Sequence, residues 1–263
     1  MEVSGTHPST AEGAKINGVR ILLFYAIAIT ISNLFRFDLF ELNARLAEWS
    51  GLGYVVIRNV LEGSGVFLGA LCGLYLLKKA RPLTISLWGT SQKFVLLMAL
   101  VPFFLITVIG LRNKFGVNEH LFGAVATIAV LIYCVMEEYG WRGYLQQELS
   151  GLQQLTKYLV IGLLWYLWHL PFLENPSVLA NVLFLGTLVL GSWGIGQVAV
   201  LTRSIGASAC VHFVVNITFF NVFFHKALDP LMVGVVIAVC VAAWVIILRK
   251  WKGAGLGTQG GLQ

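Results

Sequence analysis

The residues best suited to chemistry lie in the segment VMEEYGWRGY, residues 135–144, within an apolar run that starts near residue 121. Glu137 and Glu138 are adjacent, and Arg142 follows Glu138 by four residues. Residues four apart share a helix face, so we expect Glu138 and Arg142 to pair, whereas Glu137 points about 100° away. A charge inside a bilayer costs about 2.5–3.5 kcal/mol on insertion scales and therefore needs a partner or a function. Glu137, which has no local cation, is the candidate for catalysis, and the pair is the expected structural support.

Two further polar groups lie in apolar segments later in the chain. Trp165 precedes His169 by four residues, and His212 precedes Asn216 by the same spacing. Each pair therefore shares one face of a helix and points into one space. As an alternative, these side chains could simply hydrogen-bond neighbouring helices as packing contacts.

The depth of these groups in the membrane can be compared along the chain. Glu137 lies 14 residues before a turn expected near Gly151, and His169 lies 18 residues after it. At 1.5 Å per residue the two differ in depth by only about 6 Å. His212 follows a second turn, near Arg203, that we expect on the same side of the membrane. The three groups can therefore converge in one half of the bilayer.

A glutamate, two histidines and an asparagine are sufficient for amide hydrolysis. A carboxylate and a histidine can activate a water molecule, and a second histidine with an amide can donate hydrogen bonds to the oxyanion that forms. The sequence has no GxSxG nucleophile motif and no HExxH zinc motif. Asparagine is also a poor zinc ligand but a suitable oxyanion donor, so we expect no cofactor. The alternative is a zinc enzyme in which Glu137, His169 and His212 bind the metal.

The elements that must position these residues are membrane helices. Hydrophobic residues make up 58% of the 263 residues and charged residues only 11%, against about 25% in soluble domains, and the mean hydropathy is +0.82. The composition predicts an all-α polytopic membrane protein with about eight transmembrane helices, because a span needs about 20 apolar residues. The expected spans are residues 18–36, 54–77, 93–111, 121–141, 157–172, 178–201, 206–224 and 229–248. The positive net charge is explained by cytoplasmic loops, so we expect the lipid bilayer as a partner and no nucleic acid.

The domain organisation follows from these spans. Residues 1–17 form a polar tail, residues 18–250 one transmembrane domain with a catalytic core at about 119–224, and the Gly-rich residues 251–263 a flexible tail. Most of the 18 Lys and Arg residues fall in segments on the same side as the N-terminus. The positive-inside rule therefore predicts that both termini are cytoplasmic.

Three smaller features have structural interpretations. Residues 36–53 mix charged and aromatic residues in a pattern typical of an amphipathic helix at the membrane interface. Arg58 and Glu62 are four residues apart and are expected to neutralise each other. The segment Gly-Ser-Gly at residues 63–65 is expected to be a helix-packing site.

The motif set resembles a known family of membrane peptidases. Glu137-Glu138-xxx-Arg142, Trp165-xxx-His169 and His212-xxx-Asn216 follow in this order on three helices, as in the CAAX protease and bacteriocin-processing family, which includes the type II CAAX prenyl endopeptidases. That family commonly has Phe where this chain has Trp165. The resemblance implies that Glu137 and His169 activate the water, that His212 and Asn216 form the oxyanion hole, and that Glu138 with Arg142 orients the site.

The resemblance also implies a substrate and a location. The substrate would be a membrane-tethered or prenylated, CAAX-like protein or peptide, and the enzyme a multi-pass protein of the inner membrane in a prokaryote or of the endoplasmic reticulum in a eukaryote. The alternative is a non-catalytic immunity or scaffold protein, or a transporter that uses the same polar cluster. A transporter would more often show repeated halves, and no repeat is visible in the sequence.

Overall fold

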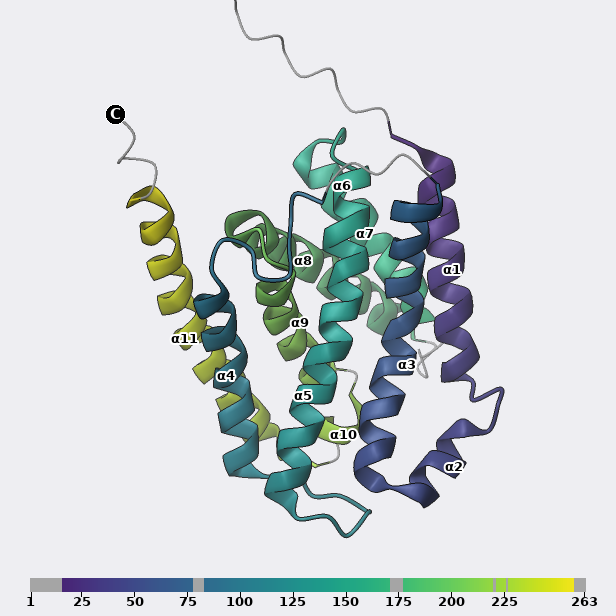
Figure 1. Ribbon diagram of the computed structural model, residues 1–263, viewed down its shortest axis with the longest axis vertical. Coiled ribbons are helices and arrows are strands. Elements are labelled where there is room, and N and C mark those ends of the chain that lie inside the picture. Colours follow the sequence, from purple (N-terminus) through teal and green to yellow (C-terminus); the bar gives the residue numbers. More distant parts are fainter. Residues whose placement is uncertain (1–15, 78–82, 171–176, 220, 226, 258–263) are drawn as a thin grey trace, which may run out of the picture.

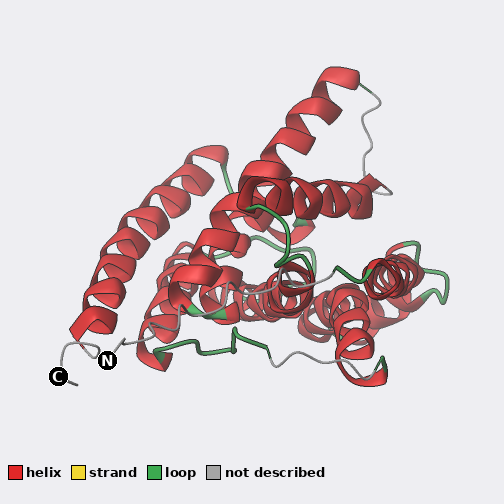
Figure 2. Ribbon diagram, turned by 90° about the horizontal axis from the view of Figure 1, so that it is seen from above, coloured by secondary structure: helices red, strands yellow, loops and turns green. Residues whose placement is uncertain are grey.

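The described part of the chain is built from helices. The computed structural model describes residues 16–77, 83–170, 177–219, 221–225 and 227–257. These residues form helices joined by loops, with one isolated bridge between Ser86 and Ser204 and no strand among them (Figures 1 and 2). In a bilayer a helix satisfies its own backbone hydrogen bonds, which is why apolar segments adopt it. The predicted all-α class is confirmed.

The order and bounds of the elements are as follows. The helices are α1 Gly18–Arg36, α2 Leu42–Trp49, α3 Gly51–Leu71, the π-helix η1 Cys72–Leu76, α4 Gln92–Ile109, α5 Glu119–Glu138, the π-helix η2 Tyr139–Leu145, α6 Gln146–Glu148, α7 Gln154–His169, α8 Val178–Thr202, α9 Ile205–Phe219, α10 Val222–His225 and α11 Pro230–Gly257.

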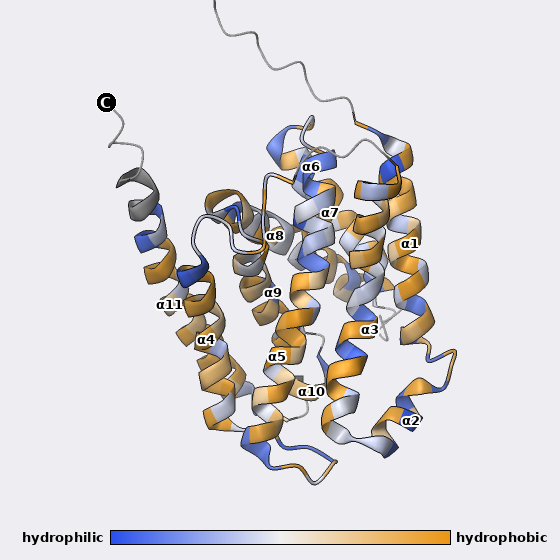
Figure 3. Ribbon diagram, in the orientation of Figure 1, coloured by the Kyte–Doolittle hydropathy of each residue, from blue (hydrophilic) through white to orange (hydrophobic). Residues whose placement is uncertain are grey.

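Helix length and composition identify the candidate membrane spans. Within the described residues, six helices are long and apolar enough to cross a bilayer: Gly18–Arg36, Gly51–Leu76, Gln92–Ile109, Glu119–Glu148, Val178–Thr202 and Pro230–Gly253 (Figure 3). The other two expected spans correspond to α7 and α9, which have 16 and 15 residues and therefore reach about 24 Å or less, against a core of about 30 Å. The count of eight is not confirmed. Residues 171 and 172 of the expected fifth span lie outside the described part.

The bundle is organised around α5. Helix α5 packs against α3, α4 and α9; α1 packs on α3, α7 on α8, and α11 lies beside α4 (Figure 1). The contact between α1 and α3 is close because a Cβ added at Gly65 would lie 2.6 Å from the carbonyl oxygen of Ala28. Gly65 belongs to the segment expected to be a packing site, and its missing side chain lets the two backbones approach.

The start of the first helix and the end of the last helix lie on the same side of the bundle. Helix α1 begins and α11 ends at the same end of the molecule (Figure 1), while the side of the membrane that this end occupies stays a prediction. We expected a flexible tail from residue 251, but α11 continues to Gly257. The reason is tertiary: Trp251 is buried, stacks on Phe94 at 5.4 Å and donates a hydrogen bond to Oγ1 of Thr90 at 2.6 Å. Residues 1–15 and 258–263 of the expected tails lie outside the described part.

The segment between α1 and α3 contains the short helix α2. Its flanks and its last residue expose the large apolar side chains of Phe37, Leu39, Phe40 and Trp49. This arrangement agrees with the amphipathic interfacial segment expected at residues 36–53.

Candidate active site

The two glutamates lie at the C-terminal end of α5, and each has a partner four residues later in η2. Nη1 of Arg142 donates to Oε1 of Glu138 at 2.8 Å, and both side chains are fully buried. The expected pair is therefore present. Nε1 of Trp141 donates to Oε2 of Glu137 at 3.2 Å. Glu137 has no cation four residues away, as expected, but it does have a local neutral donor that the sequence reasoning did not include.

Both donors come from a π-helical segment rather than a continuation of α5. η2 covers Tyr139–Leu145, and all of its residues from Gly140 to Leu145 are buried. A π-helix has wider turns than an α-helix and occurs frequently at functional sites. The indole of Trp141 and the guanidinium of Arg142 thus reach back to the last turn of α5.

His212 and Asn216 of α9 face these carboxylates. Nδ1 of His212 lies 2.8 Å from Oε1 of Glu138, and Nε2 lies 3.9 Å from Oε2 of Glu137. Nδ2 of Asn216 lies 3.2 Å from Nε2 of His212 and donates to Sγ of Cys134 at 3.5 Å. His212 therefore links both glutamates to Asn216.

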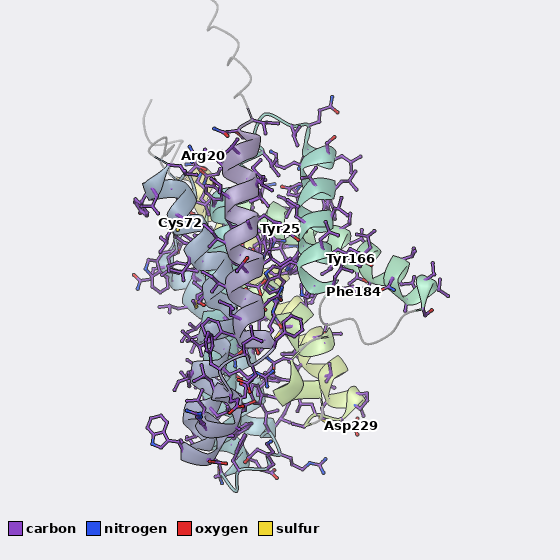
Figure 4. All side chains as sticks on the ribbon, turned by 90° about the vertical axis from the view of Figure 1, so that its right-hand side faces the viewer. Arg20, Tyr25, Cys72, Tyr166, Phe184 and Asp229 are labelled. Atoms are coloured by element: carbon purple, nitrogen blue, oxygen red, sulfur yellow. The ribbon has the colours of Figure 1, made fainter. Side chains whose placement is uncertain are left out.

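His169 lies at the C-terminal end of α7, and its tautomer follows from one contact. Nδ1 of His169 lies 2.8 Å from the carbonyl oxygen of Trp165, which can only accept, so Nδ1 carries a proton. In the neutral ring, Nε2 is then left as an acceptor. The ring of Phe184 from α8 packs against His169 with centroids 5.7 Å apart, where α8 leaves the bundle beside Tyr166 (Figure 4).

Trp165 connects the three motifs. Its ring centroid lies 5.7 Å from that of His169 and 4.9 Å from that of His212, and the guanidinium carbon of Arg142 lies 5.0 Å from it. Among the described residues, Glu137 and His169 form no direct hydrogen bond or ion pair with each other. They are joined through aromatic rings, because Trp141 contacts Trp168, the neighbour of His169.

The predicted site residues thus form one buried cluster. Glu137, Glu138 and Arg142 are 0% exposed, His212 is 2% exposed, and His169 and Asn216 are each 5% exposed. The family model of the Rce1-like type II CAAX prenyl endopeptidases matches residues 119–218, which contain all of them. This segment is an Rce1-like region. No curated protein matches the chain.

The match confirms the family resemblance inferred from the three motifs. It indicates a membrane protease of the CAAX type, and the long apolar helices make the chain a multi-pass membrane protein. Helices α1, α3, α4 and α11 lie outside the Rce1-like region but pack against it.

A metal site does not follow from the described side chains of the Rce1-like region. The donors considered for zinc were Glu137, His169 and His212. In the described part of the chain, no three His, Cys, Asp or Glu side chains are arranged so that they could hold a metal ion. We therefore derive no step through a metal.

Several side chains near the site were missed by sequence reasoning. Tyr133 lies one turn before Glu137 and interacts with it, a relation that its spacing could have indicated. Cys134, the residue after Tyr133, accepts a hydrogen bond from Asn216. The charge of Arg36, at the end of α1, interacts electrostatically with Tyr133 and Glu137, and no sequence spacing could have predicted this interaction.

The pair on α3 has the structural role expected of it. Nε of Arg58 lies 2.7 Å from Oε1 of Glu62, and the side chains are 27% and 24% exposed. Arg58 also donates to the hydroxyl of Tyr54 at 2.8 Å. The pair neutralises its own charges at the edge of the bundle.

Proposed function

We propose that this chain is an intramembrane glutamate-type endopeptidase that hydrolyses a peptide bond in a membrane-tethered or prenylated, CAAX-like protein or peptide. The observation that carries the proposal is the state of Glu137 in the Rce1-like region. Oε2 accepts from Trp141, whereas Oε1 is buried and accepts no hydrogen bond from the described residues. A buried carboxylate oxygen that accepts no other hydrogen bond can accept a proton from the water that attacks the peptide bond.

The proposed reaction begins with water activation. A water held between Oε1 of Glu137 and Nε2 of His169 gives one proton to Glu137 while its oxygen bonds to the carbonyl carbon of the scissile peptide. The carbonyl double bond becomes a single bond to an oxyanion. When the C–N bond breaks, Glu137 returns the proton to the leaving nitrogen, which departs as an amine, and a carboxylic acid remains.

The proposed oxyanion hole consists of His212 and Asn216. An N–H of Asn216 can donate directly, and His212 can donate through Nε2 when both of its ring nitrogens carry protons. The buried Glu138–Arg142 pair supports this role because Oε1 of Glu138 lies against Nδ1 of His212 and sets the orientation of the ring. Donors held in this way before the reaction need no reorganisation as the negative charge develops.

The orientation in the membrane and the substrate class complete the proposal. Both termini would be cytoplasmic, and the site would accept substrates from that side of the membrane. The substrate class comes from the description of the matching family. A non-catalytic scaffold would use the same buried cluster without turnover, and the experiment below separates the two.

The test is peptide cleavage by the purified protein in liposomes, with matched prenylated and unprenylated peptides. Glu137→Gln keeps the size of the side chain but removes the base, and His169→Ala removes its partner. General-base catalysis contributes about 10²–10⁴-fold, so each variant should lose at least about 100-fold in kcat. Glu48→Gln and His120→Ala, which change exposed residues of the same types, are the controls.

The outcomes distinguish the proposals. Wild-type cleavage by Glu137→Gln, or no cleavage of any panel peptide by the wild type, would count against the peptidase. A zinc chelator should leave the rate unchanged. Loss of activity on chelation, restored by added zinc, would replace the metal-free mechanism with a metalloprotease.

A further inference from the structure

Arg36 is a cation from outside the Rce1-like region that reaches the candidate site. It is the last residue of α1, and its guanidinium carbon lies 3.4 Å from the ring centroid of Trp168. Nη1 of Arg36 also donates to the carbonyl oxygen of Trp168 at 3.0 Å. One side chain of α1 thus makes two contacts with the residue that immediately precedes His169.

These contacts act on the last turn of α7. The helix ends at His169, and the final carbonyl groups of a helix have no partner within it. A cation at this end also interacts favourably with the partial negative charge of the helix terminus. Arg36 therefore holds the turn from which His169 projects. The planar guanidinium suits this task because it stacks on the indole and donates to the carbonyl at the same time.

The charge of Arg36 also interacts with the motif on α5. It attracts the carboxylate of Glu137 and interacts with Tyr133, four residues earlier on the same face of that helix, whereas it repels a positive charge on His169. Electrostatic interactions are stronger in a buried, low-dielectric site than at the surface. Arg45 provides a contrast nearby: its side chain is 74% exposed and lies 3.9 Å from the exposed Glu41.

We propose that Arg36 is a positioning residue of the peptidase. From a helix outside the Rce1-like region, it ties the turn that carries His169 to the helix that carries Glu137. It thereby holds the two groups at the separation that one shared water requires. This inference rests on the proposed function, because it assigns Arg36 to the same reaction. A displacement of the reacting groups by about 1 Å can lower the rate by about 100-fold, so losing the contacts of Arg36 should have a measurable effect.

The test compares Arg36→Ala and Arg36→Lys with Arg45→Ala, in the liposome assay and per folded molecule. Arg36→Ala should lower kcat by about 10- to 100-fold with KM nearly unchanged, since Arg36 positions the reacting groups rather than the substrate. Added methylguanidinium should restore part of this rate by occupying the space left by the side chain. Arg36→Lys keeps the charge but lacks the planar fork, so we expect a smaller loss of kcat, and Arg45→Ala should match the wild type.

The alternative outcomes are distinct. Wild-type kcat in Arg36→Lys, or a loss in Arg36→Ala that methylguanidinium does not restore, would overturn the positioning role. If Arg36→Ala does not fold, Arg36→Lys alone decides. Glu137→Gln, measured beside them, separates the two proposals. If Glu137→Gln is inactive and the Arg36 variants are fully active, only the role of Arg36 fails. If Glu137→Gln cleaves normally, the proposed function itself fails.

Discussion

Replacing Arg142 by Met should destabilise this protein strongly, because it would leave the buried carboxylate of Glu138 without its cation. Nη1 of Arg142 lies 2.8 Å from Oε1 of Glu138, and neither side chain is exposed. Met keeps much of the apolar stem of Arg142 but removes the positive charge. Glu138 would retain His212 as a neighbour at 2.8 Å, while its second oxygen, Oε2, already lacks a hydrogen bond within the described residues.

The expected magnitude follows from this burial. Removing one partner of a buried ion pair typically costs about 3–5 kcal/mol, because the desolvation of the remaining charge is no longer compensated. At about 1.4 kcal/mol per factor of ten, the ratio of folded to unfolded protein should fall by at least about 100-fold. Arg45→Met is the matched control, since Glu41 and Arg45 have the same sequence spacing but their side chains are 84% and 74% exposed. An exposed pair contributes about 0–1 kcal/mol, so this control should lose far less.

The assay is unfolding of the purified variants in one detergent, followed by circular dichroism. The double variant Glu138→Gln with Arg142→Met removes both charges and should recover a large part of the loss, because neutral replacements of a buried pair are often tolerated. Two results would refute the reasoning: an Arg142→Met variant no less stable than Arg45→Met, or a double variant less stable than the single one.

Two further substitutions test the surroundings of Glu137. Trp141→Phe keeps an aromatic ring but removes the donor to Oε2 of Glu137. A hydrogen bond to a charged group contributes about 1.5–3 kcal/mol, so kcat in the liposome assay should fall by about 10- to 100-fold. An unchanged kcat would show that this contact does not serve the reaction. Gly140→Ala places a Cβ 2.9 Å from the carbonyl oxygen of Val66 and 3.2 Å from the ring of Phe24, so the free energy of unfolding in detergent should fall by about 1–3 kcal/mol. Gly234→Ala is the control, because its Cβ would meet nothing within 4 Å and the change should be nearly neutral. Equal stability of the two variants would contradict the packing argument.

The sequence by itself determined the fold class and the motif residues that meet in the buried cluster. The apolar composition predicted a helical membrane protein, because the polar N–H and C=O groups of a backbone inside a bilayer must be hydrogen-bonded within the protein, and a helix achieves this. The spacing of four predicted the contact between Glu138 and Arg142, the contact between His212 and Asn216, and the pair on α3, since residues one turn apart meet in any helix. Local geometry is sufficient for such contacts.

Only the tertiary structure decided how the motifs meet and where the helices end. The approach of Nδ1 of His212 to Glu138 depends on the rotation of α9 against α5, and the contact of Arg36 with Trp168 depends on where α1 ends against α7. Helix α11 likewise continues past residue 251 because Trp251 finds a partner on α4. The physical reason is common to all three. Residues far apart in the chain meet according to how whole helices pack, and this packing is the sum of many weak contacts that no short spacing encodes.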